Sequence, residues 1–300
     1  MGVERVVILT CAMFADAPED DDAALAEALR RRGIDVRFQV WDDPAPLRDA
    51  ETVIVRSTWD YHLRHLAFNE RIDAIAREHL LINDVEMIHW NIDKRYLLDV
   101  AEAGVPIVPT VMIVPCNPPD VGGIMRRNGW SAAVVKPSVG ANSEDVTFVA
   151  SLDDEDRAWD AAVNLQRRSN VLVQEFMPNV RTSGEHALIY IDGVFSHVVR
   201  KKPFDSLPPG EKVQTVRAEA DDALRALGAS ALRFVEERFG TPAYARIDAV
   251  RDPHDRWRIM EVELIEPSLY LNATPDAADR LADAVVRRMR DASRGLCAGG

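Results

Sequence analysis

Residues 243–263 read AYARIDAVRDPHDRWRIMEVE. Apolar residues dominate both ends of this stretch, and Asp252-Pro253 between them predicts a turn. We therefore expect two neighbouring strands, Ala243 to Val250 and Trp257 to Glu263, which pair around that turn. Paired strands hold their side chains on defined faces, so the charged residues of this stretch should share fixed positions.

Three acidic residues of these strands predict a metal site. Glu261 and Glu263 are two positions apart, so both side chains point to the same face of their strand. Asp248 lies on the neighbouring strand. Carboxylates crowded on one face repel one another unless a cation sits between them, and oxygen ligands suit Mg²⁺. The alternative is a charged strand face that is exposed to solvent.

Upstream, the first ninety residues alternate short apolar runs with helical patterns. The apolar runs lie at 6–9, 36–40, 52–55 and 80–82, and the helical patterns at 23–32 and 66–78. This alternation predicts a parallel sheet with helices on its faces, where ligands bind beyond the carboxyl ends of the strands. Arg56, Ser57, Trp59 and Tyr61 follow one such end, and Arg56 should face a cleft and bind a substrate carboxylate. Alternatively, they form an ordinary loop with Trp59 in the core.

Between these two regions lie motifs that suit a nucleotide. Lys94 precedes a helix, and Lys136 ends a strand that continues into a small Gly/Ser loop. Another strand ends at Gln174-Glu175. The proline- and glycine-rich residues 115–123 predict a loop.

Composition narrows the class of protein. The chain has 300 residues and a net charge of −13, which argues against a nucleic-acid partner. No apolar run approaches the roughly 20 residues that span a membrane. Cys11, Cys116 and Cys297 are far apart and form neither a metal motif nor an obvious disulfide framework. We expect a cytoplasmic enzyme with two or three lobes.

The order of these motifs resembles the ATP-grasp superfamily, in the branch of glutathione synthetase, D-alanine ligase and the ribosomal-modification ligases. The resemblance covers about residues 90 to 290. It implies an α/β fold with an N-terminal Rossmann-like domain (1–92), a central α+β lobe (93–175) and a C-terminal α+β lobe (176–300). ATP would be gripped between two sheets, with one or two Mg²⁺ ions, and a carboxylate would be activated as an acyl phosphate.

The resemblance also implies roles for individual residues. The implied ATP-binding residues are Lys94, Lys136, Gly140, Asn142, Ser143, Gln174, Glu175, Phe176, Met177 and Glu185. The implied Mg²⁺ ligands are Asp248, Glu261 and Glu263, although the third position is often asparagine in the superfamily. The catalytic candidates are Arg246, Lys136 and Arg200. The substrate candidates are Arg56, Ser57, Trp59 and Tyr61, together with Glu266 and Ser268 beyond the metal strand.

The runs Arg-Ser-Thr-Trp-Asp-Tyr at 56–61 and Glu-Pro-Ser at 266–268 resemble one subgroup of the superfamily. That subgroup contains the D-cycloserine-forming ligase of antibiotic biosynthesis, which closes O-ureido-D-serine into a ring. The resemblance therefore implies a small amino-acid-like substrate and intramolecular ring closure. Two alternatives remain, namely an intermolecular carboxylate–amine ligase and a nucleotide-binding module without catalysis. A homodimer is possible under each reading.

Overall fold

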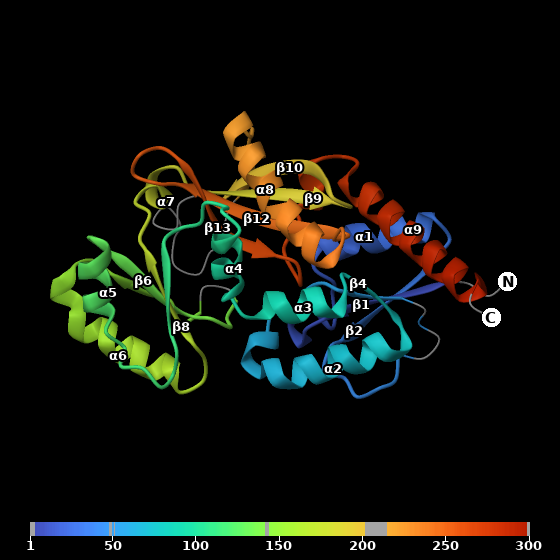
Figure 1. Ribbon diagram of the computed structural model, residues 1–300. Coiled ribbons are helices and arrows are strands. Elements are labelled where there is room, and N and C mark those ends of the chain that lie inside the picture. Colours follow the sequence, from blue (N-terminus) through green and yellow to red (C-terminus); the bar gives the residue numbers. More distant parts are fainter. Residues whose placement is uncertain (1–3, 48–49, 51, 142–143, 202–214, 299–300) are drawn as a thin grey trace.

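The structure is a computed structural model that describes residues 4–47, 50, 52–141, 144–201 and 215–298. Its strands form three sheets, each built from one region of the chain. Figure 1 shows the N-terminal sheet and the long helix α9 at one end of the molecule. The sheet of residues 110–175 lies at the other end, with the sheet of residues 185–263 between them. Within the described ranges, none of the helices has the length and apolar character that crossing a membrane needs.

The N-terminal sheet is parallel, as its alternating pattern predicted. Its spatial order is β2-β1-β3-β4, with β1 at Arg5–Thr10, β2 at Asp35–Val40, β3 at Thr52–Val55 and β4 at Leu80–Ile82. Its helices are α1 (Asp20–Arg31), α2 (His65–Glu78) and α3 (Val85–Ile92), with 3₁₀ turns at Ala12–Phe14 and Tyr61–Arg64. Val6 and Ile8 pack with α1, whereas Val7 and Leu9 pack with α2 and α3. Helices therefore bury the sheet on both faces, which explains its continuous apolar strands.

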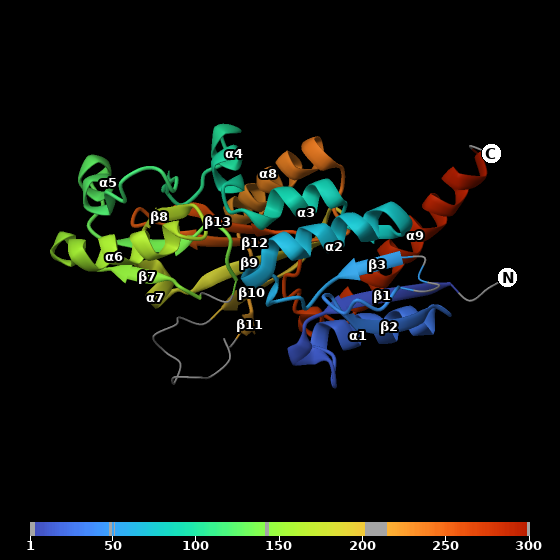
Figure 2. The ribbon, with the colours of Figure 1, turned by 90° about the horizontal axis from the view of Figure 1, so that it is seen from below.

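Helix α9 (Ala277–Ala298) returns to the N-terminal sheet, beside which it lies in Figure 2. It packs against α1, and its residues Leu281 and Val285 share one hydrophobic core with Leu25 of α1. The last helix therefore joins the core of the first sheet. The division into 1–92, 93–175 and 176–300 stays a prediction.

The central lobe is built on an antiparallel sheet in the order β5-β8-β6-β7. Its strands are β5 (Thr110–Ile113), β6 (Ala133–Pro137), β7 (Thr147–Val149) and β8 (Val171–Glu175). Its helices are α5 (Val121–Asn128) and α6 (Glu155–Gln166), with a 3₁₀ turn at Leu152–Asp154. Helix α4 (Tyr96–Glu102) packs instead in the core of the C-terminal sheet. Val135 and Val173 pack in one core with residues of α5 and α6. Their neighbours Lys136 and Gln174 therefore point to the opposite face of the sheet.

The loop expected over residues 115–123 is shorter than predicted. Helix α5 begins at Val121, and the carboxylate of Asp120 accepts a hydrogen bond of 2.8 Å from the N–H of Gly123. This side-chain cap satisfies one of the free N–H groups at the helix start. Burial of Val121, Ile124 and Met125 against the sheet then outweighs the low helix propensity of glycine.

The C-terminal sheet is antiparallel, in the order β11-β10-β9-β12-β13. Its strands are β9 (Glu185–Ile191), β10 (Val194–Lys201), β11 (Thr215–Arg217), β12 (Tyr244–Arg251) and β13 (Trp257–Glu263). Its helices are α7 (Asn179–Thr182) and α8 (Asp222–Phe239), with a 3₁₀ turn at Leu271–Ala273. Ala245 and Ile247 share a core with α8, so Arg246 and Asp248 between them point to the other face.

The central and C-terminal sheets meet at one backbone junction. Ile107 bridges to Ile259 of β13 in the parallel sense. The N–H of Val108 donates to the carbonyl of Ile259 at 2.8 Å, and the N–H of Ile259 donates to the carbonyl of Pro106 at 2.9 Å. Met177, just beyond β8, packs with Val108 in a small core. This junction fixes the ends of the two sheets relative to each other.

Candidate active site

The three carboxylates predicted from the sequence converge on one face of the C-terminal sheet. Strands β12 and β13 pair antiparallel, with Asp248 opposite Glu261 and Arg246 opposite Glu263. One carboxylate oxygen from each of Asp248, Glu261 and Glu263 can be chosen so that all lie within 4.8 Å of one another. A set of oxygen donors at this spacing suits a hard cation, so the residues present fit Mg²⁺.

Two cations of the same sheet lie against these carboxylates. Arg246 donates to both oxygens of Asp248, with Nε–Oδ1 at 3.0 Å and Nη2–Oδ2 at 3.1 Å, and it also pairs with Glu263. The Nζ of Lys201 lies 2.5 Å from Asp248 Oδ2 and 3.3 Å from Glu185 Oε2. The Arg246 and Asp248 side chains are only 9% and 2% exposed. Buried pairs with this geometry hold Asp248 in one orientation.

Two lysines from the central lobe approach the cluster from the other side. Lys136, near the end of β6, places its Nζ 3.2 Å from Glu261 Oε1. Lys94 lies 4.0 Å from the same oxygen and donates to the carbonyl of Gly140 at 2.7 Å. Lys136 and Glu261 belong to different sheets, so this ion pair crosses from one lobe to the other. Cations from both lobes therefore surround the carboxylates, an arrangement that suits a polyphosphate with its metal.

Burial and neighbouring charges shift the pKa values of this cluster in different directions. Burial raises the pKa of Glu263 to about 7. The positive charge of Arg246 lowers this pKa, and the negative charges of Asp248 and Glu261 raise it further. Burial also acts on Glu261, but Lys94 and Lys136 outweigh it and hold its pKa well below the ordinary value. Burial and the neighbouring carboxylates thus oppose ionisation of Glu263, and a divalent cation held between the three carboxylates would favour its charged form.

The segment predicted to bind adenine lies at the junction of the two sheets. The backbone N–H groups of Glu175 and Phe176 donate to carbonyls of the central lobe at 2.9 and 3.0 Å. The side-chain amide of Gln174 donates to Thr110 Oγ1 at 2.9 Å, and the side chain of Met177 is buried. The backbone here is held in place, and adenine binding stays a prediction.

The predicted phosphate loop is described only in part. Asn142 and Ser143 lie outside the described residues. A side chain at Gly140 would place its Cβ 2.9 Å from Pro137 Cγ, closer than side chains normally approach, which accounts for glycine at this position. Farther along, Glu144 Oε2 lies 3.0 Å from Nε2 of His62. Glu144 therefore contacts the N-terminal domain.

Arg56 does not face a cleft, contrary to the prediction. Its side chain is 2% exposed, and its Nε donates to Asp22 Oδ1 at 3.1 Å. The guanidinium also lies over the ring of Tyr244, 5.1 Å from the centroid. Ser57 donates to the other oxygen of Asp22 at 2.6 Å. A buried guanidinium needs a carboxylate partner, and Asp22 at the start of α1 supplies it. Arg56 and Ser57 thus attach α1 to the end of β3.

The two aromatic residues of the same run differ in position. Tyr61 is 4% exposed and packs against Phe68 with ring centroids 4.9 Å apart, so it is a core residue rather than a substrate-facing one. Trp59 is half-buried, and its Nε1 donates to the carbonyl of Glu266 at 3.2 Å. Burial, reinforced by the charge of Glu263, raises the pKa of Glu266 to about 8. Trp59 therefore contacts the segment that follows the metal strand.

Arg200 points away from the carboxylates, which corrects its assignment as a catalytic residue. In the antiparallel register of β9 and β10, Lys201 pairs with Glu185 and Arg200 pairs with His186. Neighbouring residues on a strand point to opposite faces, and Lys201 is the one that contacts Asp248. Arg200 and Lys201 are adjacent cations, and the register selects the lysine.

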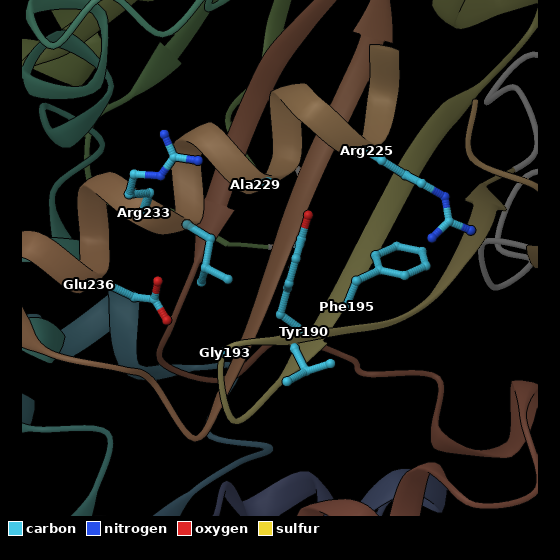
Figure 3. Close-up of a pocket in the computed structure, with 9 residues that line it drawn as sticks. Tyr190, Gly193, Phe195, Arg225, Ala229, Arg233 and Glu236 are labelled. Atoms are coloured by element: carbon cyan, nitrogen blue, oxygen red, sulfur yellow. The ribbon is translucent and has the colours of Figure 1, made fainter. Parts of the chain in front are cut away.

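Two surface depressions lie on the α8 side of the C-terminal sheet. One has a volume of about 440 Å³; Figure 3 shows Tyr190, Phe195, Arg225 and Glu236 at its edges, on β9, β10 and α8. The other, of about 410 Å³, is lined by Arg200 and its neighbours. No carboxylate of the cluster lines either depression, so we place the candidate active site on the opposite face.

Comparisons with known proteins identify the family. The family model described as D-cycloserine synthetase DcsG, N-terminal domain, matches residues 6–83. The cycloserine biosynthesis protein DcsG of Streptomyces lavendulae is 33% identical over 287 residues, which cover 90% of this chain and 94% of that protein.

Solved structures give the same result. The crystal structure of D-cycloserine synthetase DcsG matches with a TM-score of 0.85 and 30% identity, covering 95% of this chain and 99% of that one. The ATP-grasp ligase PsnB, solved with a minimal precursor, Mg and ADP, matches with a TM-score of 0.63 and 16% identity. That match covers 95% of this chain and 98% of PsnB and supports the fold alone. The chain therefore has the fold of the ATP-grasp ligases and belongs to the D-cycloserine synthetase family.

Proposed function

We propose that this ligase closes O-ureido-D-serine into D-cycloserine, using ATP and Mg²⁺ and releasing ADP and phosphate. The observation that carries the proposal is the complete charged cluster described above, in a chain that resembles DcsG over nearly its whole length. A binding module without catalysis has no need to keep cations from both lobes on one set of carboxylates. We therefore favour an active enzyme over a nucleotide sensor.

The cluster suits phosphoryl transfer. Asp248, Glu261 and Glu263 would hold one or two Mg²⁺ ions, whose charge would neutralise the triphosphate. Lys94 and Lys136, which contact Glu261 here, would then bind the phosphate oxygens. Phosphoryl transfer asks a protein mainly for positioning and charge neutralisation, and these groups supply both.

Two residues lie closest to the transferred group in this proposal. Arg246 reaches Asp248 and Glu263 at once, so its guanidinium borders the metal site directly. Lys201 borders it from β10 through its contact with Asp248. Both cations would stabilise the negative charge that spreads over the transferred phosphoryl group.

The nucleoside end is assigned to the junction of the two sheets. Gln174, Glu175, Phe176 and Met177 would bind adenine through backbone groups and the Gln174 amide. Glu185 would bind the ribose hydroxyls, and Gly140 with Asn142 and Ser143 would cover the phosphates. The fixed backbone of this segment and the contact of Glu185 with Lys201 support this placement.

The chemistry needs three steps. An oxygen of the substrate carboxylate attacks the γ-phosphorus, the bond to the β-phosphate oxygen breaks, and ADP leaves. The oxygen-bound nitrogen of the ureido group of the same molecule then attacks the acyl carbon, loses its proton and displaces phosphate. Hydrolysis of the carbamoyl group on that nitrogen, with water as the co-reactant and CO₂ and ammonia as the products, leaves the N–H of D-cycloserine. Trp59, Glu266 and Ser268 border the site where this molecule would bind, and ionised Glu266 could hold its ammonium group.

Phosphate release tests the proposal. The purified protein is incubated with Mg²⁺, ATP and O-ureido-D-serine alone, while phosphate is followed and D-cycloserine is identified by mass spectrometry. We expect one phosphate for each ring formed, and no dependence on an added amine. Saturation kinetics in a separately supplied amine would instead establish an intermolecular ligase. Asp248→Asn serves as the control for contaminating phosphatase.

A further inference from the structure

The carboxylate of Asp21 makes an unusual set of contacts with a distant segment. Asp21 is the second residue of α1, and its side chain is buried. Its Oδ2 accepts hydrogen bonds from the N–H groups of Leu269 and Tyr270 at 2.7 and 2.8 Å. Its Oδ1 accepts from the N–H of Leu271 at 2.7 Å. One carboxylate thus satisfies three consecutive backbone donors that lie about 250 residues away in the chain.

Capping of α1 does not explain these contacts. The side chain of Glu19 is the cap, because it accepts a hydrogen bond from the N–H of Asp21 at 2.8 Å. Asp20 stands in the same first turn, is exposed, and supplies the same favourable charge at the helix start. The helix therefore has its cap and its charge without the Asp21 carboxylate, which is directed at residues 269–271 instead.

The segment that Asp21 holds has a strained backbone. Tyr270 has a φ of +50°, in the left-handed region that residues with a Cβ rarely adopt. Such conformations persist where surrounding contacts over-determine them, and they gather at functional sites. The three hydrogen bonds to Asp21 supply that constraint. Without them, the segment would relax towards an ordinary conformation.

The same segment borders the charged cluster. The carbonyl of Ser268 accepts a hydrogen bond of 3.3 Å from Arg246 Nη1. The carbonyl of Leu269 accepts one of 3.0 Å from His197 Nε2, which fixes the segment to β10. The pKa of Tyr270 is raised by burial, and the charges of Arg246 and Lys201 oppose that rise. The phenol of Tyr270 therefore interacts electrostatically with Arg246 and Lys201, the two cations that we assign to phosphoryl transfer.

We propose that Asp21 is a positioning residue, which holds residues 268–271 in a strained conformation at the edge of the active site. Through this segment the N-terminal domain positions Arg246 and the backbone of residues 268–271, beside which the organic substrate binds. The inference rests on the proposed function for the roles of Arg246 and of the substrate. The hydrogen bonds and the backbone conformation stand independently of it.

Asp21→Asn tests the proposal, with Asp20→Asn as the matched control. The asparagine side chain has nearly the same size, but its amide NH₂ must face at least one of the three N–H donors, so bonds are lost and donors oppose each other. Both variants remove one negative charge from the first turn of α1. The difference between them therefore isolates the contacts to residues 269–271.

Hydrogen exchange of the free protein provides the first measurement. We expect the amides of Leu269, Tyr270 and Leu271 to exchange about tenfold faster or more in Asp21→Asn, and to be unchanged in Asp20→Asn. Amide protection in the core of β12 should be equal in the two variants. Unchanged exchange at 269–271 in Asp21→Asn would show that Asp21 does not hold this segment. This measurement needs no substrate, so it tests the hold of Asp21 on the segment even if O-ureido-D-serine is not turned over.

Kinetics provide the second measurement. In Asp21→Asn we expect KM for O-ureido-D-serine to rise and its kcat/KM to fall about 10- to 100-fold, because the site is displaced, with KM for ATP within about twofold of wild type. A merely structural defect would lower the active fraction and leave both KM values unchanged. Faster exchange with unchanged kcat/KM would overturn the positioning role. If the wild-type protein releases no phosphate with O-ureido-D-serine, that result contradicts the proposed function and not the hold of Asp21 on residues 269–271.

Discussion

Replacing Lys201 by methionine removes the ammonium group that contacts Asp248 and Glu185, while it keeps an unbranched side chain of similar length. Lys201 Nζ lies 2.5 and 3.3 Å from the two carboxylates, and the side chains of Lys201 and Asp248 are 17% and 2% exposed. Burial opposes its charge, yet Asp248 and Glu185 raise the pKa of Lys201 above its ordinary value, so the group is charged at neutral pH. The variant therefore leaves the buried carboxylate of Asp248 with Arg246 as its remaining positively charged partner among the described residues.

The magnitude follows from this geometry. Removing one partner from a buried ion pair costs about 3 to 5 kcal/mol, and Arg246 still compensates Asp248, so we expect the lower end. The metal-free Lys201→Met protein should lose about 3 kcal/mol in its free energy of unfolding. Saturating Mg²⁺ should recover part of this loss, because the ion supplies the missing positive charge. We expect kcat to fall about 100-fold, the typical effect of one lost charge-stabilising group.

Arg200→Met is the matched control, because Arg200 is the next residue on β10 and points to the other face. Unfolding is followed by urea titration with and without Mg²⁺, and turnover is followed by phosphate release with saturating substrates. Arg200→Met should change kcat by less than about twofold. Equal losses in the two variants, or a greater loss in Arg200→Met, would refute the assignment of Lys201 to the site.

Glu261→Gln should leave the fold intact but weaken Mg²⁺ binding, raising the Mg²⁺ concentration for half-maximal activity about tenfold; full activity at limiting Mg²⁺ would contradict its role as a ligand. Arg56→Lys should lower the free energy of unfolding by about 2 kcal/mol, because lysine cannot both pair with Asp22 and cover Tyr244. Unchanged stability with a tenfold higher KM for the organic substrate would instead restore the substrate role. Burial opposes ionisation of Asp252, but backbone N–H groups and two arginines lower its pKa to about 2. Asp252→Asn should therefore lower the free energy of unfolding by about 2 kcal/mol at neutral pH. The stabilisation by Asp252 is fully present above about pH 4 and is lost as the pH falls through about 2. Urea titrations at a series of pH values measure it, and an equal loss at both ends of the series would disprove the prediction.

The sequence determined the features that depend on local spacing. Glu261 and Glu263 share a face because they are two positions apart on a strand, and this holds whatever the strand packs against. The alternation of strands and helices likewise implied the parallel N-terminal sheet. The pattern failed where local and tertiary effects oppose each other. Gly122 and Gly123 indicated a loop, but the Asp120 cap and the burial of Val121 and Ile124 place both glycines inside α5.

Only the tertiary structure decided which charged residues reach the active site. Arg200 and Lys201 are adjacent and both cationic, and the register of β10 against β9 selects Lys201. Arg56 stands at the carboxyl end of a strand, where ligands often bind, yet it is buried and its Nε donates to Asp22 of α1. Strand register and the arrival of a distant carboxylate are properties of packed elements. A side chain's partner depends on what the fold places opposite it, and the sequence around that side chain does not contain this information.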